Sequence, residues 1–165
     1  MLGDYVRDKD AVTAARLLTE MAAWYADQGM TLYDALQALY AKYGFYDEKT
    51  LNLVMPGLEG MAKMKALMDG LRSDPPTHIA GTPVLVRKDY SNGTALCVET
   101  GQTDTMELSG SNVLRYELSD GTTILVRPSG TEPKVKVYIL ASGNSKADCQ
   151  DKTAKYAVWA ESLRN

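Results

Sequence analysis

Apolar residues recur every three or four positions in two early segments of the chain, which is the spacing of a helix with one apolar face. The first segment covers residues 14–25 and ends before Gly29. The second begins at Thr31, whose side chain can form a capping box with Asp34, and it ends at Gly44. The pattern therefore predicts two consecutive helices separated by a short turn.

After these helices the pattern changes to strands separated by few helices. We expect a strand over residues 46–55 and then a helix over residues 58–71, which the sequence Asp74-Pro75-Pro76 ends. The apolar residues of this helix are expected to face inward, and they are Leu58, Met61, Met64, Leu67, Met68 and Leu71. Two later segments have the composition of strands, residues 84–89 and, more weakly, residues 95–99.

The polar segment 101–110 is expected to be a loop, and the clearest hairpin follows it. Its two strands cover residues 113–118 and 122–127, and they join through Asp120-Gly121, a pair that readily adopts the positive φ angles of a tight turn. Another strand is expected over residues 133–140.

A last helix is expected from Ser145, with Asp148 in its first turn, to about Leu163. Few helices separate the late strands, so we predict an α+β fold in which helices pack on one face of an antiparallel sheet. Residues 45–165 would form this sheet domain, and residues 1–44 would form a separate helical segment.

The composition is that of an ordinary globular chain, with 165 residues, of which 45% are hydrophobic and 24% charged. The formal net charge of −3 argues against binding to nucleic acid or to an anionic membrane surface. Cys97 and Cys149 lack the spacing of metal ligands, and we expect both to be reduced thiols. The sequence has no signal-peptide pattern and no apolar run of membrane-spanning length, so we expect a cytoplasmic protein.

Anion-binding chemistry is concentrated in one loop, which follows the second strand of the predicted hairpin. Within five residues this loop offers the guanidinium of Arg127, the hydroxyls of Ser129 and Thr131, and a freely turning backbone at Gly130. A planar cationic fork and several short donors are what a phosphate group requires. The alternative is a polar turn in which Pro128 and Gly130 serve only the backbone geometry.

Two lysines follow this loop on one face of the next strand. Lys134, Lys136 and Tyr138 alternate there with Val135 and Val137. Strand lysines commonly protect a solvated sheet edge, and this is one interpretation. The other is that they provide a positive field that attracts the phosphate, which would make them supporting residues of the site.

The octapeptide Arg127-Pro128-Ser129-Gly130-Thr131-Glu132-Pro133-Lys134, followed by Val-Lys-Val-Tyr, resembles the phosphate-binding signature of the phosphoglucomutase/phosphomannomutase superfamily. The resemblance extends to residues 111–116 and 6–12, although Ala11 stands where the family often has Gly. It implies that Lys9 lies near the active cleft of the parent enzyme. It also implies that the non-reacting phosphate of a sugar phosphate is bound by Arg127, Ser129, Gly130 and Thr131.

The same resemblance implies a domain arrangement. Residues 45–165 would be the C-terminal domain, whose architecture is related to the TATA-binding-protein-like fold, although DNA binding does not follow from that shape. Residues 1–44 would be the helical tail of the preceding, third domain. The family's catalytic serine segment and its magnesium loop, Asp-x-Asp-x-Asp-Arg, do not occur in this sequence. We therefore expect a C-terminal fragment that is inactive alone and contains no catalytic residue, metal ligand or cofactor, while another domain of the parent binds Mg²⁺.

The resemblance implies a parent enzyme that interconverts sugar 1-phosphates and 6-phosphates through a phosphoserine and a bisphosphorylated intermediate. Glucose phosphates are the favoured substrates, and mannose phosphates are the alternative. In isolation the chain is expected to bind a sugar phosphate, phosphate or sulfate. The apolar faces of its first two helices favour association between chains, and the alternatives are that these helices pack on the C-terminal domain or remain mobile. The competing interpretation is a stand-alone phosphate-binding or protein-interaction module without catalysis.

Overall fold

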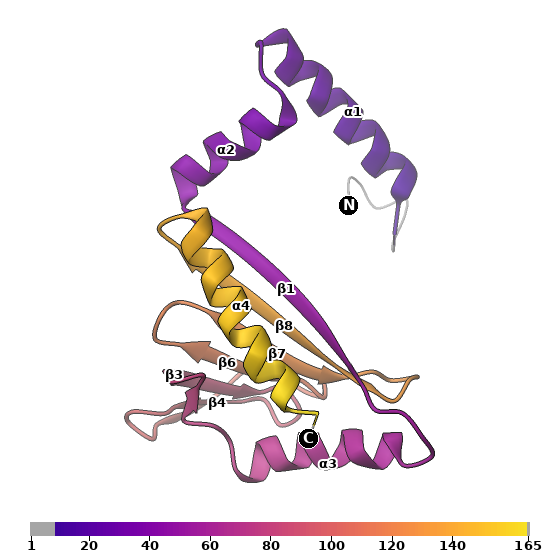
Figure 1. Cartoon of the computed structure of the whole chain (residues 1–165), viewed down its shortest axis with the longest axis vertical. Coiled ribbons are helices and arrows are strands. Elements are labelled where there is room, and N and C mark those ends of the chain that lie inside the picture. Colours follow the sequence, from indigo (N-terminus) through magenta and orange to yellow (C-terminus); the bar gives the residue numbers. More distant parts are fainter. Residues whose placement is uncertain (1–8, 165) are drawn as a thin grey trace. The chain divides into compact units, whose positions relative to one another are not determined.

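The computed structural model of the chain describes residues 9–164 (Figure 1). The chain divides into two compact units, Met1–Gly44 and Phe45–Asn165. Among the described residues, no helix combines the length and the apolar character that crossing a lipid bilayer requires.

Two helices make up the described part of the first unit. Helix α1 (Ala11–Asp27) begins after Asp10, whose carboxylate accepts a backbone N–H of the first turn at 2.9 Å. Helix α2 (Leu32–Tyr43) begins after Thr31, which forms a reciprocal capping box with Asp34. Both helices predicted from the sequence are confirmed, together with the cap of the second.

The apolar faces of these two helices stay largely exposed within their unit. Helix α1 has no buried residue, and helix α2 buries Ala35. The exposed large apolar side chains on the two helices are Val12, Leu17, Leu18, Met21, Trp24, Tyr33, Leu36, Leu39 and Tyr43. The described part of this unit therefore has little core of its own.

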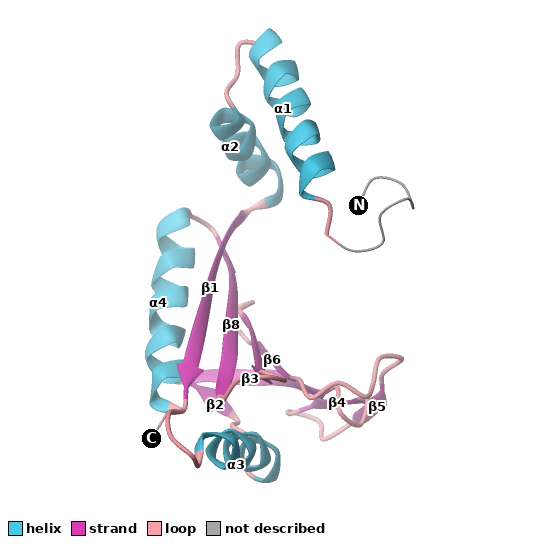
Figure 2. Ribbon diagram, turned by 90° about the vertical axis from the view of Figure 1, so that its right-hand side faces the viewer, coloured by secondary structure: helices cyan, strands magenta, loops and turns pink. Residues whose placement is uncertain are grey.

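An antiparallel sheet forms the framework of the second unit (Figure 2). Its described strands are β1 (Phe45–Val54), β2 (His78–Ile79), β3 (Thr82–Asp89), β4 (Thr94–Cys97), β5 (Thr103–Thr105), β6 (Leu114–Leu118), β7 (Thr123–Pro128) and β8 (Lys134–Gly143). They run in the order β1-β8-β7-β6-β3-β4-β5, and β2 pairs with β3 off this path. All of these pairings are antiparallel.

Helices α3 (Gly60–Ser73) and α4 (Lys146–Ser162) cover one face of this sheet, which we call the helix face (Figure 2). Along β6, β7 and β8, buried side chains on this face alternate with more exposed ones on the opposite, open face. The core between the sheet and the helices contains Leu53, Met68, Tyr116, Ile124, Val126, Val135, Val137, Ile139 and Tyr156. The predicted α+β fold, with helices on one face of an antiparallel sheet, is confirmed.

Two details differ from the sequence-based expectation. Leu58 lies before helix α3 and is fully exposed, and Met61 is 51% exposed, so neither faces inward as predicted. The helix begins at Gly60, later than the apolar spacing suggested, and its buried methionines are Met64 and Met68. The segment expected to be a loop contains β5, a polar and exposed strand that only its pairing with β4 defines.

A polar cluster of Asp120, Thr122, Lys152 and Tyr156 joins the β6–β7 turn to helix α4 through hydrogen bonds. The Asp120 carboxylate accepts the Thr122 N–H at 3.0 Å and the Tyr156 hydroxyl at 2.6 Å. Burial alone would raise the pKa of Asp120, but these hydrogen bonds outweigh it and hold the pKa below its usual value. The Lys152 ammonium donates to the Asp120 and Ser142 carbonyls at 3.1 and 2.7 Å. These hydrogen bonds fix the β6–β7 hairpin to helix α4, and the candidate loop follows strand β7 of this hairpin.

Candidate functional site

The loop between β7 and β8 is closed by short backbone hydrogen bonds. The Ser129 N–H donates to the Lys134 carbonyl at 2.8 Å, and the Lys134 N–H donates to the Glu132 carbonyl at 2.7 Å. The amide of Ser129 is thus already used inside the loop. A ligand at this loop can receive a hydrogen bond from the Ser129 hydroxyl, whereas the Ser129 backbone N–H is not available to it.

The far end of the loop is braced against the junction of β1 and α3. The Met55 N–H donates to the Pro133 carbonyl at 2.8 Å. Gly60 lies beside this contact, because a Cβ added there would be 2.1 Å from the Met55 carbonyl oxygen and 2.9 Å from Pro133 Cβ. Only glycine permits this approach, so the position of the loop depends on a residue that is remote in sequence.

The groups that the sequence assigns to phosphate binding lie at the surface of the loop. Arg127, Gly130 and Thr131 are exposed, and Ser129 is half-buried. The structure therefore brings these four residues together in one exposed turn, where a solute can reach the guanidinium and both hydroxyls.

Positive charge next to this turn is only partly neutralised. Lys134 forms an ion pair with Glu132, 2.5 Å between Nζ and Oε2, and this pair lowers the pKa of Glu132. Arg127 has neither an ion pair nor a side-chain hydrogen bond with the described residues. It lies directly opposite Lys136 in the β7–β8 register, and both side chains are on the open face. Two cations opposite each other repel, and an anion placed between them would relieve the repulsion.

Farther along the open face, the charges balance more closely. The Glu117 carboxylate on β6 accepts a hydrogen bond from Lys88 at 2.7 Å and forms an ion pair with Arg115 at 3.0 Å. These two cations share one carboxylate, whereas Arg127 and Lys136 have no carboxylate in ion-pair contact among the described residues. The uncompensated positive charge of this face is therefore strongest beside the loop.

The remaining predicted site residue, Lys9, belongs to the first unit. It is exposed and directly precedes the Asp10 cap of α1. Arg7, which belongs to the resembling N-terminal segment, lies outside the described residues. Within the described part of the chain, no group of three or more His, Cys, Asp or Glu side chains could hold a metal ion.

Most of the second unit matches a known protein family. The family model described as phosphoglucomutase/phosphomannomutase, C-terminal domain, matches residues 51–155, which include the whole sheet from the middle of β1 and the candidate loop. The chain belongs to the phosphoglucomutase/phosphomannomutase family.

Relatives named phosphoglucomutase support the same family. The chain is 38% identical to one from Staphylococcus haemolyticus and 37% identical to one from Staphylococcus aureus strain bovine RF122, over 82% of this chain in both cases. A third, from Staphylococcus epidermidis, is 32% identical over 84% of the chain. The chain spans about a quarter of the length of these phosphoglucomutases, with coverages of 25%, 24% and 25%.

The sequence alone does not reveal the contact of Met55 and Gly60 with Pro133, which positions the candidate loop of this chain. The local pattern does not mark Gly60 or Met55, because their role depends on how the β1–α3 junction meets Pro133. One signal was present, since a glycine at the start of an apolar helix often marks a close approach of two backbones.

Proposed function

We propose that the chain is the substrate-phosphate-binding, C-terminal portion of a phosphohexomutase. The parent would interconvert sugar 1-phosphates and 6-phosphates through a phosphoserine and a bisphosphorylated intermediate. The observation that carries this proposal is the exposed Arg127 guanidinium, which lacks an ion-pair partner among the described residues, faces Lys136 across the sheet, and adjoins the hydroxyls of Ser129 and Thr131.

Each residue of the loop has a distinct role in this proposal. Arg127 provides a charge and a forked pair of hydrogen bonds to two phosphate oxygens. Ser129 donates through its hydroxyl, Thr131 donates through its hydroxyl and amide, and Gly130 allows the phosphate to approach the backbone. Lys136 adds the second positive charge, which matches the two negative charges of a phosphate monoester.

In this proposal the donors contact the phosphate group and make no contact with the sugar ring. A bisphosphorylated intermediate has to turn end for end, so the same loop must accept the phosphate on either end of the sugar. Recognition of the phosphate alone meets that requirement. The energy of binding this remote phosphate would then position the reacting end of the sugar in the parent enzyme.

The reactive groups are expected outside this chain. The described residues offer no cluster suited to Mg²⁺, and the family's serine and magnesium motifs do not occur in the sequence. No step of the reaction is therefore assigned to a metal bound here, and the chain alone is expected to have no mutase activity. Glucose phosphates are the favoured substrates, since the relatives are named phosphoglucomutase, and mannose phosphates are the alternative.

The proposal is tested by titrating the ¹⁵N-labelled chain with glucose 1-phosphate, glucose 6-phosphate and glucose. Both phosphates should shift the amide signals of Gly130 and Thr131 with similar affinities, because the loop reads the shared phosphate group. Glucose should leave these signals in place. A response to only one of the two isomers, or an equal response to glucose, would contradict recognition of phosphate independent of the sugar.

A further inference from the structure

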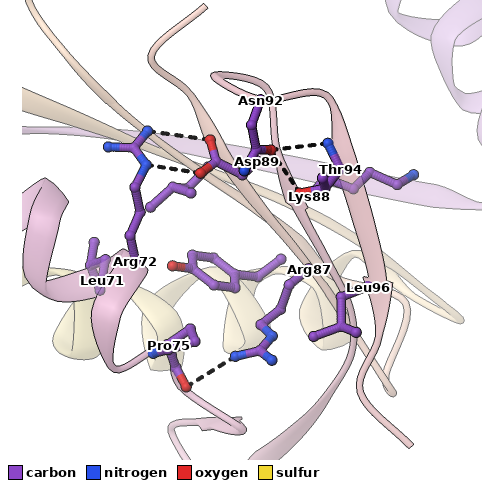
Figure 3. Close-up of a pocket in the computed structure, with 11 residues that line it drawn as sticks. Leu71, Arg72, Pro75, Arg87, Lys88, Asp89, Asn92, Thr94 and Leu96 are labelled. Atoms are coloured by element: carbon purple, nitrogen blue, oxygen red, sulfur yellow. Dashed lines mark hydrogen bonds and ion pairs between the residues drawn. The ribbon is translucent and has the colours of Figure 1, made fainter. Parts of the chain in front are cut away.

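A pocket lies on the helix face of the sheet, away from the phosphate loop. It has a volume of about 290 Å³ and is enclosed by the end of α3 and by strands β3, β4 and β6 (Figure 3). The lining residues that matter here are Leu71, Arg72, Arg87, Asp89, Leu96 and Tyr116. Its size is at the lower end of the range for small-molecule sites.

Tyr116 brings an unsatisfied polar atom to this pocket. The residue is 2% exposed, and its hydroxyl has no hydrogen-bond partner among the described residues. Burial raises the pKa of this phenol well above its usual value, while the nearby charges of Arg87 and Arg72 act in the opposite direction. The hydroxyl is therefore a neutral donor that lies within the field of two guanidinium groups. A buried donor without a partner is unfavourable and calls for an acceptor.

Of the two guanidinium groups, that of Arg72 already has hydrogen-bond acceptors within the protein. Its Nε and Nη2 donate to Asp89 at 2.9 and 3.3 Å (Figure 3). Nη2 also donates to Asn112 at 2.6 Å. Asp89 balances its charge. This pair closes one side of the pocket and adds no net charge to it.

Arg87 is in a different situation. Its side chain makes one long hydrogen bond, from Nη1 to the Pro75 carbonyl at 3.4 Å (Figure 3). It has no carboxylate in ion-pair contact among the described residues, and it is half-buried. The pocket consequently contains one uncompensated positive charge, beside the unsatisfied hydroxyl of Tyr116.

A bulge in β3 creates this arrangement. Val84 pairs with Leu118, but Val86 pairs with Glu117, so β3 contains one extra residue at this point. The alternation of faces shifts by one after the bulge, which turns Arg87 to the helix face opposite Tyr116. Bulges often re-aim side chains next to binding sites.

We propose that this pocket binds a small organic acid with a single negative charge. Its carboxylate would accept hydrogen bonds from the Arg87 guanidinium and the Tyr116 hydroxyl, and a short apolar body would lie against Leu71 and Leu96. One carboxylate neutralises the one unbalanced charge, whereas a phosphate dianion would leave an excess negative charge in a partly apolar pocket.

This site is separate from the phosphate loop. Tyr116 pairs across the sheet with Ile124, and both are buried on the helix face. Arg127 lies three residues after Ile124, on the open face. The two sites therefore lie on opposite faces of the sheet and on different strands, so a ligand of one has no contact with the other.

Butyrate is a suitable probe, and the test is a titration of the ¹⁵N-labelled full chain followed through its amide signals. We expect saturable shifts at Leu71, Leu96 and Tyr116. The uncharged isostere butyramide should cause none, and inorganic phosphate should shift the Gly130 and Thr131 signals instead. If butyrate causes no saturable shift at the pocket, the pocket holds only water and the proposal is wrong.

Two variants assign the binding to the named groups. Arg87→Gln should weaken butyrate binding at least tenfold, and Tyr116→Phe, which keeps the ring and removes only the hydroxyl, should weaken it several-fold. Lys65→Gln, which removes an exposed charge of α3 that pairs with Asp69, is the matched control and should bind butyrate like the wild type. A dispersed amide spectrum verifies the fold of each variant. Wild-type affinity in a folded Arg87→Gln or Tyr116→Phe variant would overturn the proposal.

Discussion

Arg127 and Lys136 lie directly opposite each other across β7 and β8, with both side chains on the open face of the sheet. Like charges at a cross-strand pair destabilise a sheet, and no carboxylate among the described residues forms an ion pair with either one. The repulsion between Arg127 and Lys136 therefore lowers the stability of the fold slightly, at the position where a phosphate is expected to bind.

Replacement of Lys136 by glutamine should have opposite effects on stability and on binding. Without phosphate or sulfate, Lys136→Gln should raise the free energy of unfolding by a few tenths of a kcal/mol, because the repulsion with Arg127 is removed. With phosphate, the variant should gain less stability than the wild type, because its site has lost one charge. Urea unfolding at low ionic strength, with and without phosphate, measures both effects.

Lys88→Gln is the matched control for this experiment. Lys88 lies on the same face but forms an ion pair with Glu117 at 2.7 Å, so its replacement should not increase stability. Its phosphate response should equal that of the wild type. If Lys136→Gln were the less stable protein in the absence of anions, the repulsion described above would not exist.

The contact of Gly60 with Met55 and Pro133, which positions the loop, can be tested by comparing Gly60 with Gly70 of the same helix. Gly60→Ala would place a methyl group 2.1 Å from the Met55 carbonyl oxygen, so we expect a loss of about 1–3 kcal/mol and weaker phosphate binding. At Gly70 an added Cβ meets no atom within 4 Å, so Gly70→Ala should raise stability by about 0.5–1 kcal/mol. Thermal unfolding and phosphate titration compare the two. Equal effects of the two substitutions would mean that the close approach at Gly60 does not position the loop.

The polar cluster at the β6–β7 turn predicts a pH-dependent effect. Tyr156→Phe removes the 2.6 Å hydrogen bond to Asp120 together with the 2.8 Å hydrogen bond between the Tyr156 and Thr82 hydroxyls, and it should cost about 1–2 kcal/mol at pH 7. The pKa of Asp120 is lowered in the fold, so its stabilising contribution is present above the unfolded pKa and is lost as the pH falls through the folded value. The cost of Tyr156→Phe should therefore shrink below about pH 4.

Urea unfolding of the wild type and Tyr156→Phe at neutral and acid pH measures this difference. Tyr138→Phe is the control, because the Tyr138 hydroxyl has no hydrogen bond to the described residues, and it should change stability by less than about 0.5 kcal/mol at either pH. A cost of Tyr156→Phe that stays constant from neutral to acid pH would show that the ionised Asp120 is not its partner.

Much of this fold could be predicted from local pattern. The helix caps at Thr31 and Ser145, the hairpin at Asp120-Gly121 and the alternation along β8 all depend on residues close in sequence, and all are confirmed. Of the two turn residues, Gly121 has the expected positive φ and Asp120 does not. The four candidate phosphate ligands also come from one contiguous loop, so the sequence could name them, although their role as ligands stays a prediction.

Features that depend on register and long-range packing could not be predicted in this way. The sequence Val84-Leu85-Val86-Arg87 gives no sign of a bulge, yet the bulge decides that Arg87 faces Tyr116. The contact of Gly60 with Pro133 joins segments far apart in the chain. The polar strand β5 has no apolar pattern, and it exists through its pairing with β4.

The most direct test of phosphate binding at this loop is calorimetry of inorganic phosphate with the wild-type chain and its Arg127→Ala variant. Charge-assisted hydrogen bonds contribute about 1.5–3 kcal/mol, so we expect Arg127→Ala to weaken binding about tenfold to a hundredfold. Arg115→Ala is the control, since Arg115 shares the open face but forms an ion pair with Glu117 at 3.0 Å, and it should bind like the wild type. If Arg127→Ala binds phosphate as tightly as the wild type, the β7–β8 loop is not the phosphate site.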